Sequence, residues 1–136
     1  MSQLIEYEDA SDEVQTVYDD ICATRQIDRI NNFWKALANH PPTLKRTWES
    51  VKDIMTRPGE LDPLTRELIY IAVSVTNGCE YCIASHTAAA RNQGMSETLL
   101  GELLSIVALA NTTNRLANGY QVPVDTQFKT WEHSLD

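Results

Sequence analysis

Residues 61–96 read "LDPLTRELIYIAVSVTNGCEYCIASHTAAARNQGMS", and this stretch decides the fold class. Asp62 followed by Pro63 is typical of a helix start, because aspartate caps free N–H groups and proline fits the first turn. The helix should end at Gly78, since glycine readily adopts the left-handed conformation of a helix end. "IYIAVSV" is β-branched enough for a strand, but the upstream cap favours a helix. The next helix carries two cysteines and a histidine and should end near Gly94.

Helical signals continue on both sides of this stretch. Ser11 caps an expected first helix, "NNFWKALAN" predicts a short second one, and a third follows "HPP". Ser96 caps a sixth helix, "LLSIVALANTTNRLAN" predicts one more, and "TQFKTWEH" predicts a helical turn in the tail. We therefore expect an all-α fold with a single domain over residues 1–136. Its parts would be N-terminal helices in residues 1–40, a core at about residues 42–120 and a tail in residues 121–136.

Composition restricts the class of protein. The chain has 136 residues, enough for one domain, and its 43 % apolar residues can bury a core. The formal net charge of −8 argues against nucleic acid or an anionic membrane surface as a partner, because both attract positive charge. No apolar run approaches transmembrane length, and "MSQLIEYEDASDE" does not resemble a signal peptide. We therefore expect a cytoplasmic protein, in a compartment that keeps thiols reduced.

Cys79, Cys82 and His86 follow one another at i, i+3 and i+7, which places them within roughly 60° on one helical face. His86 lies one turn after Cys82, so its imidazole can take the thiol proton and stabilise the reactive thiolate. Cys79 follows Gly78 at the expected helix start, where free N–H groups and the helix dipole also favour a thiolate. Since two cysteines one turn apart can close a disulfide, the group supplies a nucleophile, a base and a second thiol.

The preceding helix adds a carboxylate. Glu67 lies on the apolar stripe of that helix, where burying a charge without a partner would be costly. Arg66 points nearly the opposite way and is not an expected partner. If the two helices form a hairpin around "TNG", Glu67 faces the cysteines and the histidine of the next helix. A carboxylate beside His86 would orient the ring and form a proton relay.

Less specific interpretations stay open for the same residues. A CxxC pair also occurs by chance or in zinc sites, and Cys79, Cys82, His86 and Glu67 could supply four zinc ligands. Ligands packed onto one helix suit a tetrahedron poorly, and the chain has no second CxxC. Glu67 could instead lie at the edge of its stripe and reach water. Cys22 makes the cysteine count odd, falls on an apolar helical face and is expected to be an unreactive core residue.

The combination resembles the AhpD-like alkylhydroperoxidase family, within the carboxymuconolactone decarboxylase superfamily. The signature of that family is a glutamate, eleven residues, CxxC, three residues and a histidine. Here Glu67, Cys79, Cys82 and His86 meet that spacing, and residues 61–96 as a whole look like the family core. The resemblance implies an all-helical AhpD-like domain that assembles as a symmetric homo-oligomer, a trimer or a hexamer.

The resemblance also implies a function, a thiol-dependent peroxidase that reduces alkyl hydroperoxides to alcohols without a cofactor. Cys82 would attack the peroxide, Cys79 would resolve the sulfenic acid as a disulfide, and Glu67 and His86 would relay the proton. The helix-start argument alone favours Cys79 as the nucleophile, whereas the neighbouring His86 and the family chemistry favour Cys82. A lipoyl protein or a thioredoxin-like partner would supply electrons. Tyr81 stands where some members carry a further relay histidine, so one part of the relay is absent.

Three rival functions stay open. The first is a general disulfide oxidoreductase, which would use the same two thiols. The second is a non-redox enzyme like the decarboxylases of the superfamily, although these do not need the CxxC pair. The third is a non-catalytic oligomer with a metal site.

Overall fold

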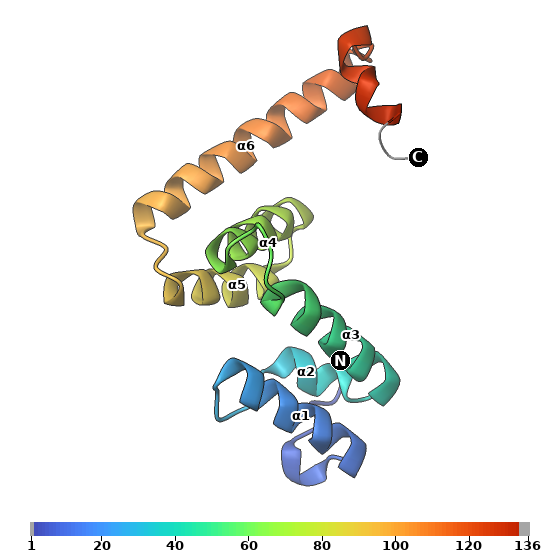
Figure 1. Cartoon of the computed structure of the whole chain (residues 1–136), viewed down its shortest axis with the longest axis vertical. Coiled ribbons are helices and arrows are strands. Elements are labelled where there is room, and N and C mark those ends of the chain that lie inside the picture. Colours follow the sequence, from blue (N-terminus) through green and yellow to red (C-terminus); the bar gives the residue numbers. More distant parts are fainter. Residues whose placement is uncertain (1, 134–136) are drawn as a thin grey trace. The chain divides into compact units, whose positions relative to one another are not determined.

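A computed structural model describes residues 2–133 of the chain, with side chains up to residue 129. The chain divides into two compact units, Met1–Glu60 and Leu61–Asp136, here called the N-terminal and the C-terminal unit. Every regular element among the described residues is a helix (Figure 1). The predicted all-α fold class is therefore confirmed. The prediction of one AhpD-like domain over residues 1–136 stays a prediction.

The N-terminal unit is built from three α-helices and a short 3-10 helix. These are η1 (Tyr7–Asp9), α1 (Asp12–Arg25), α2 (Asn32–Leu37) and α3 (Pro41–Thr56). Ser11 caps α1 as predicted, because its side-chain oxygen accepts the Val14 N–H at 3.4 Å. Gln26 ends α1 in the left-handed conformation, with φ of 55°. Pro41 occupies the first turn of α3, where a missing N–H costs nothing.

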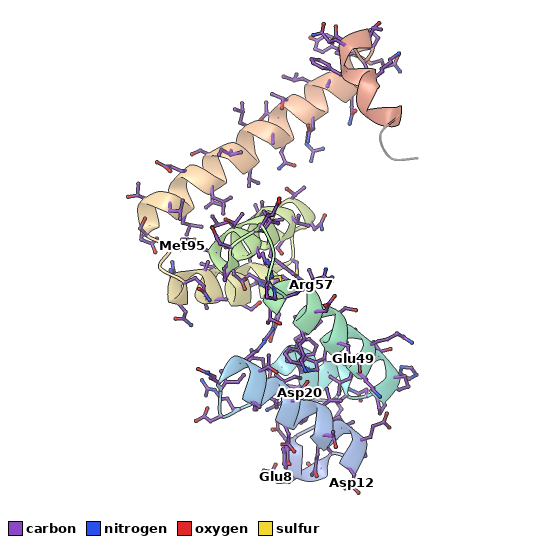
Figure 2. All side chains as sticks on the ribbon, viewed as in Figure 1. Glu8, Asp12, Asp20, Glu49, Arg57 and Met95 are labelled. Atoms are coloured by element: carbon purple, nitrogen blue, oxygen red, sulfur yellow. The ribbon has the colours of Figure 1, made fainter. Side chains whose placement is uncertain are left out.

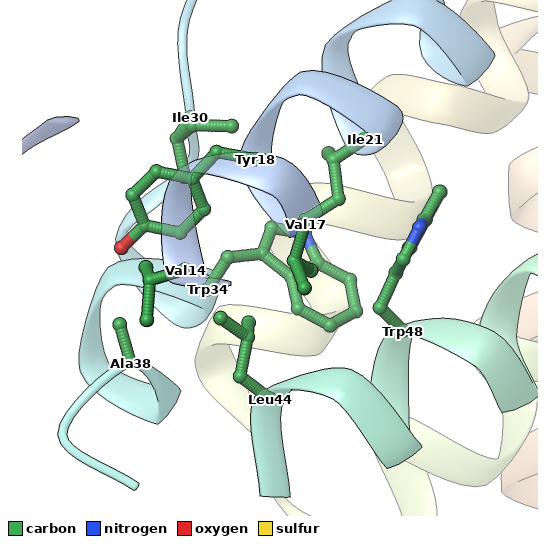
Figure 3. Close-up of a cluster of buried hydrophobic side chains, with 9 residues drawn as sticks. All are labelled: Val14, Val17, Tyr18, Ile21, Ile30, Trp34, Ala38, Leu44 and Trp48. Atoms are coloured by element: carbon green, nitrogen blue, oxygen red, sulfur yellow. The ribbon is translucent and has the colours of Figure 1, made fainter. Parts of the chain in front are cut away.

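The core of the N-terminal unit joins all three α-helices. It consists of Val14, Val17, Tyr18, Ile21, Ile30, Trp34, Ala38, Leu44 and Trp48 (Figure 3). The Trp34 and Trp48 rings meet edge to face, with centroids 5.5 Å apart, a geometry that aromatic pairs prefer. Trp48 Nε1 donates to the Asp20 carboxylate at 2.7 Å, so the polar edge of a buried indole is satisfied. This unit therefore has a hydrophobic core of its own.

The C-terminal unit contains the stretch that decided the fold. Its elements are α4 (Pro63–Asn77), α5 (Glu80–Asn92), α6 (Glu97–Gly119) and the 3-10 helix η2 (Thr126–His133). Asp62 caps α4 by accepting the Thr65 N–H at 2.7 Å, and Ser96 caps α6 by accepting the Leu99 N–H at 3.0 Å. Gly78 ends α4 with φ of 70°, a conformation that glycine adopts without strain. All three predicted boundaries are confirmed, as is the helical turn in the tail.

Packing in the C-terminal unit centres on α4, which contacts both α5 and α6. The buried apolar residues are Ile71, Ala90 and Met95, with Leu64, Leu68, Val75, Leu99, Leu100 and Leu103 packed against them. Ala90 of α5 is fully buried and packs in one cluster with Ile71 of α4. This packing holds α4 and α5 side by side.

One expectation about the helices is wrong. Ser96 was expected to start a sixth helix and residues 103–118 to form another, but the two are one continuous helix, α6. The sequence between them contains no proline, and Gly101 inside a helix costs only about 1 kcal/mol relative to alanine. The two amphipathic patterns therefore join without a break.

The outer half of α6 carries apolar side chains that this unit does not cover. Ile106, Leu109 and Leu116 are 66 %, 64 % and 53 % exposed. Their spacing places them within an arc of about 80°, and we call these three residues the α6 stripe. Figure 2 shows side chains projecting from this half of α6. None of the helices within residues 2–133 has the length and apolarity required to cross a membrane.

Candidate active site

The turn between α4 and α5 sets the geometry of the site. Gly78 reverses the chain, and Cys79 follows with extended backbone angles (φ −87°, ψ 93°) as the N-cap of α5. The Cys79 N–H donates to the Ser74 carbonyl at 3.0 Å, which ties the turn back to the end of α4. The hairpin expected around "TNG" is confirmed. Residues of α4 therefore face residues of α5.

Cys79 and Cys82 lie at the start of α5 as two unbonded, half-buried thiols. The Cys79 sulfur accepts the Cys82 N–H at 3.3 Å and so caps the helix. Only Cys82 and His86 lie within the helix itself, since Cys79 precedes its first residue. The predicted position of Cys79 at the helix start is confirmed. The roughly 60° arc was calculated for three residues inside one helix. It does not apply to Cys79, which has extended backbone angles.

The two thiols differ in their affinity for a proton. Hydrogen bonds from the Cys82 side chain and from the Cys82 N–H lower the pKa of Cys79 below its ordinary value. The same thiol–thiol hydrogen bond, together with burial and the charge of Cys79, raises the pKa of Cys82 to about 11. The first negative charge of the pair therefore forms on Cys79, and Cys82 needs a base before it can act as a thiolate.

Glu67 and His86 form the polar centre of the site. His86 Nδ1 and Glu67 Oε2 are 2.7 Å apart, and each side chain is only 16 % exposed. The expectation that Glu67 faces the next helix is confirmed. Its carboxylate contacts the imidazole of His86 and does not point only toward water. Because Glu67 engages Nδ1, Nε2 is the ring nitrogen that this carboxylate does not contact.

Tyr70 is a residue of this site that the sequence reasoning missed. Its ring stacks on the His86 imidazole, with centroids 3.6 Å apart and planes inclined by 19°. Tyr70 lies three residues after Glu67 on α4, and this spacing places both side chains on one helical face. That spacing is a usable signal, although the apolar residues of α4 make the same side of the helix look like an apolar stripe with one carboxylate.

Cys22 lies outside this site, whereas Tyr81 lies between the two cysteines in the first turn of α5. Cys22 belongs to the N-terminal unit and packs against its core, and burial, followed by the charges of Asp19 and Asp28, raises its thiol pKa. This environment fits the predicted unreactive core cysteine. Tyr81 is 42 % exposed on α5. Within the described part of the chain, no three His, Cys, Asp or Glu side chains are grouped as metal ligands.

Sequence comparison identifies the family. Residues 42–125 match the profile of the Carboxymuconolactone decarboxylase family. The chain belongs to this family. Among its relatives of known structure is the alkylhydroperoxidase AhpD core from Rhodospirillum rubrum, with a TM-score of 0.86 and 50 % sequence identity. That similarity covers 94 % of this chain and 96 % of the other, so this carboxymuconolactone decarboxylase family member has the AhpD core fold.

Curated relatives of this carboxymuconolactone decarboxylase family member match over shorter stretches. The alkyl hydroperoxide reductase AhpD from Solibacter usitatus is 38 % identical over 64 residues, which is 47 % of this chain and 34 % of that protein. An uncharacterized protein from Cupriavidus necator is 30 % identical over 81 residues, covering 60 % of this chain and 72 % of that protein. The AhpD relatives support a peroxidase or oxidoreductase role in general for an AhpD-like chain.

Proposed function

We propose that this protein is a thiol-dependent peroxidase that reduces alkyl hydroperoxides through Cys79 and Cys82. The observation that carries the proposal is the 2.7 Å contact between Glu67 and His86, on the helix pair that holds both cysteines. A thiol with a pKa of about 11, such as Cys82, reacts slowly at neutral pH unless a base removes its proton. The carboxylate and the imidazole together supply such a base.

In the first step His86 Nε2 accepts the Cys82 proton, while Glu67 stabilises the imidazolium through Nδ1. The Cys82 thiolate then attacks the oxygen of the hydroperoxide that carries the hydrogen. An S–O bond forms and the O–O bond breaks, so the sulfur loses the two electrons that the peroxide gains. The departing alkoxide takes the proton from His86 and leaves as an alcohol, and Cys82 becomes a sulfenic acid.

In the second step Cys79 resolves the sulfenic acid. Its lowered pKa makes it the thiolate of the pair, and it attacks the Cys82 sulfur without a further base. An S–S bond forms, the S–O bond breaks, and hydroxide leaves and is protonated to water. A dithiol donor, either a lipoyl protein or a thioredoxin-like protein, returns two electrons and two protons. A reducing compartment such as the cytoplasm would maintain that donor.

Chemical mapping tests this cycle directly. One equivalent of alkyl hydroperoxide should remove two thiols per chain and join Cys79 to Cys82, while Cys22 stays reduced. The disulfide peptide is identified by mass spectrometry without prior reduction, and a dithiol should restore the original thiol count. A crosslink through Cys22, or oxidation without a Cys79–Cys82 disulfide, would contradict the proposal.

A second candidate is a general disulfide oxidoreductase. It is supported by the lowered pKa of Cys79 at the start of α5, because a half-buried thiolate at a helix N-terminus still has access to a disulfide that it can attack. The same mapping experiment separates the two functions when a small disulfide replaces the peroxide. Oxidation of the pair by disulfide but not by peroxide would favour this second function.

We also propose that the chain forms a homo-oligomer, a trimer or a hexamer, through the α6 stripe. Three exposed apolar residues on one face of a helix are typical of a surface that a second copy covers. Light scattering at micromolar concentration should give a multiple of the 15.3 kDa chain mass. Leu109→Glu should lower that mass, because it introduces charges that a dry interface excludes. A wild-type mass of one chain would remove this proposal.

A further inference from the structure

We propose that Tyr70 is a positioning residue for His86, whose stacked ring fixes the imidazole and stabilises its protonated form. The inference rests on the proposed function, since it concerns the ring that takes the Cys82 proton. It is drawn from the contact between Tyr70 and His86, in which the ring centroids are 3.6 Å apart. At that distance the two ring faces are in van der Waals contact.

The two neighbours of the imidazole restrain different motions. Glu67 restrains Nδ1 at the edge of the ring through the 2.7 Å contact. Tyr70 covers one face of the ring, so the imidazole cannot rotate out of its plane without losing the stack. Both residues come from α4, one helical turn apart, so a single rigid element imposes both restraints. The direction of Nε2 is thereby set before a thiol proton arrives.

The stack also favours one charge state of the ring. The face of an aromatic ring is electron-rich and attracts a cation more strongly than a neutral group. The imidazole becomes a cation when it accepts the Cys82 proton, so the attraction to Tyr70 is greater after the transfer than before it. An interaction that is stronger in the transition state than in the ground state accelerates the reaction, whereas an interaction that is equally strong in both states does not. Tyr70 and Glu67 therefore act on the same step from different sides of His86.

The position of Tyr70 allows this role to be separated from folding. Its side chain is half-buried and is not part of the buried core of the C-terminal unit. Tyr70→Phe keeps the aromatic face and removes the hydroxyl, whereas Tyr70→Leu removes the face and keeps an apolar side chain. Tyr7→Leu, in the N-terminal unit, is a matched control for the loss of a phenol ring. Thermal unfolding of each variant reports any change in stability.

The experiment measures Cys82 oxidation by tert-butyl hydroperoxide in a single turnover. Tyr70→Leu should slow this oxidation by about 5- to 30-fold, the range expected from the loss of a cation–π contact. Tyr70→Phe and Tyr7→Leu should stay within about twofold of wild type. Proton NMR of the reduced protein provides a second readout. The His86 ring signals should carry an aromatic ring-current shift in wild type and Tyr70→Phe, and lose it in Tyr70→Leu.

Two results would overturn the inference, namely Tyr70→Leu reacting as fast as wild type and Tyr70→Phe reacting as slowly as Tyr70→Leu. The second result would assign the effect to the hydroxyl and not to the ring face. A wild-type protein that does not react with peroxide removes the proposed function instead. The His86 ring signals then decide the positioning role alone, because they do not depend on turnover.

Discussion

Cys82→Ser is expected to abolish peroxide turnover, with a loss of at least about three orders of magnitude, because removal of a catalytic nucleophile leaves only background reaction. Cys79→Ser should behave differently. It cannot complete the cycle, but Cys82 should still react once with peroxide and remain as a sulfenic acid. That reaction should be no slower than in wild type, since the thiol–thiol hydrogen bond and the Cys79 charge both raise the pKa of Cys82. A dimedone adduct located by mass spectrometry identifies the oxidised residue.

Folding of these two variants can be checked at the same site. A serine at position 79 still caps α5, because its hydroxyl can accept the Cys82 N–H. In Cys82→Ser the remaining Cys79 thiol should still be alkylated by iodoacetamide at about pH 7, since serine can also donate a hydrogen bond to it. A dimedone adduct on Cys79 in Cys82→Ser, with none on Cys82 in Cys79→Ser, would reverse the assigned roles.

Glu67→Gln is expected to slow peroxide-driven oxidation of Cys82 by about 10²-fold, the low end of the range for a general base. The amide keeps the shape of the side chain but carries no charge to stabilise the imidazolium at the 2.7 Å contact. Stopped-flow measurement of thiol loss in a single turnover gives the rate. Thermal stability should hold or rise, because an amide is less costly to bury than a carboxylate.

A matched variant controls for the loss of one negative charge. Glu102 lies exposed on α6 of the same unit, so Glu102→Gln changes the net charge equally and should leave the rate unchanged. If Glu67→Gln reacts as fast as wild type between about pH 6 and about pH 8, Glu67 is not part of a proton relay. Its contact with His86 would then serve only to hold the two helices.

Features that depend on local chemistry were predictable from sequence. Asp62, Gly78 and Ser96 mark helix boundaries because caps and left-handed ends depend on a few neighbouring residues. The meeting of Glu67 with His86 was also predictable, since a short turn between two helices leaves few ways for their polar faces to lie. Sequence spacing therefore located most of the candidate site.

Other features depend on rotation and packing that spacing does not determine. Whether Tyr70 touches the imidazole depends on how far α4 is turned toward α5, and the axis angle is set by the packed side chains. The charge distribution between Cys79 and Cys82 depends on which residue begins α5, because a shift of one position would change the N–H groups that each sulfur meets. Continuity of α6 through Gly101 depends on a small difference between helix and turn energies.

The capping role of the Cys79 sulfur links oxidation to local order. In the reduced pair this sulfur accepts the Cys82 N–H and completes the first turn of α5. A sulfur in a disulfide carries no charge and is a weaker acceptor than a thiolate, so the proposed Cys79–Cys82 disulfide would weaken the cap of α5. The oxidised form should therefore fray at this end, which faster hydrogen exchange of the Cys82 amide would report. In the proposed cycle such fraying would present the S–S bond to an incoming dithiol, so the state that needs reduction would also be the state that opens toward its reductant.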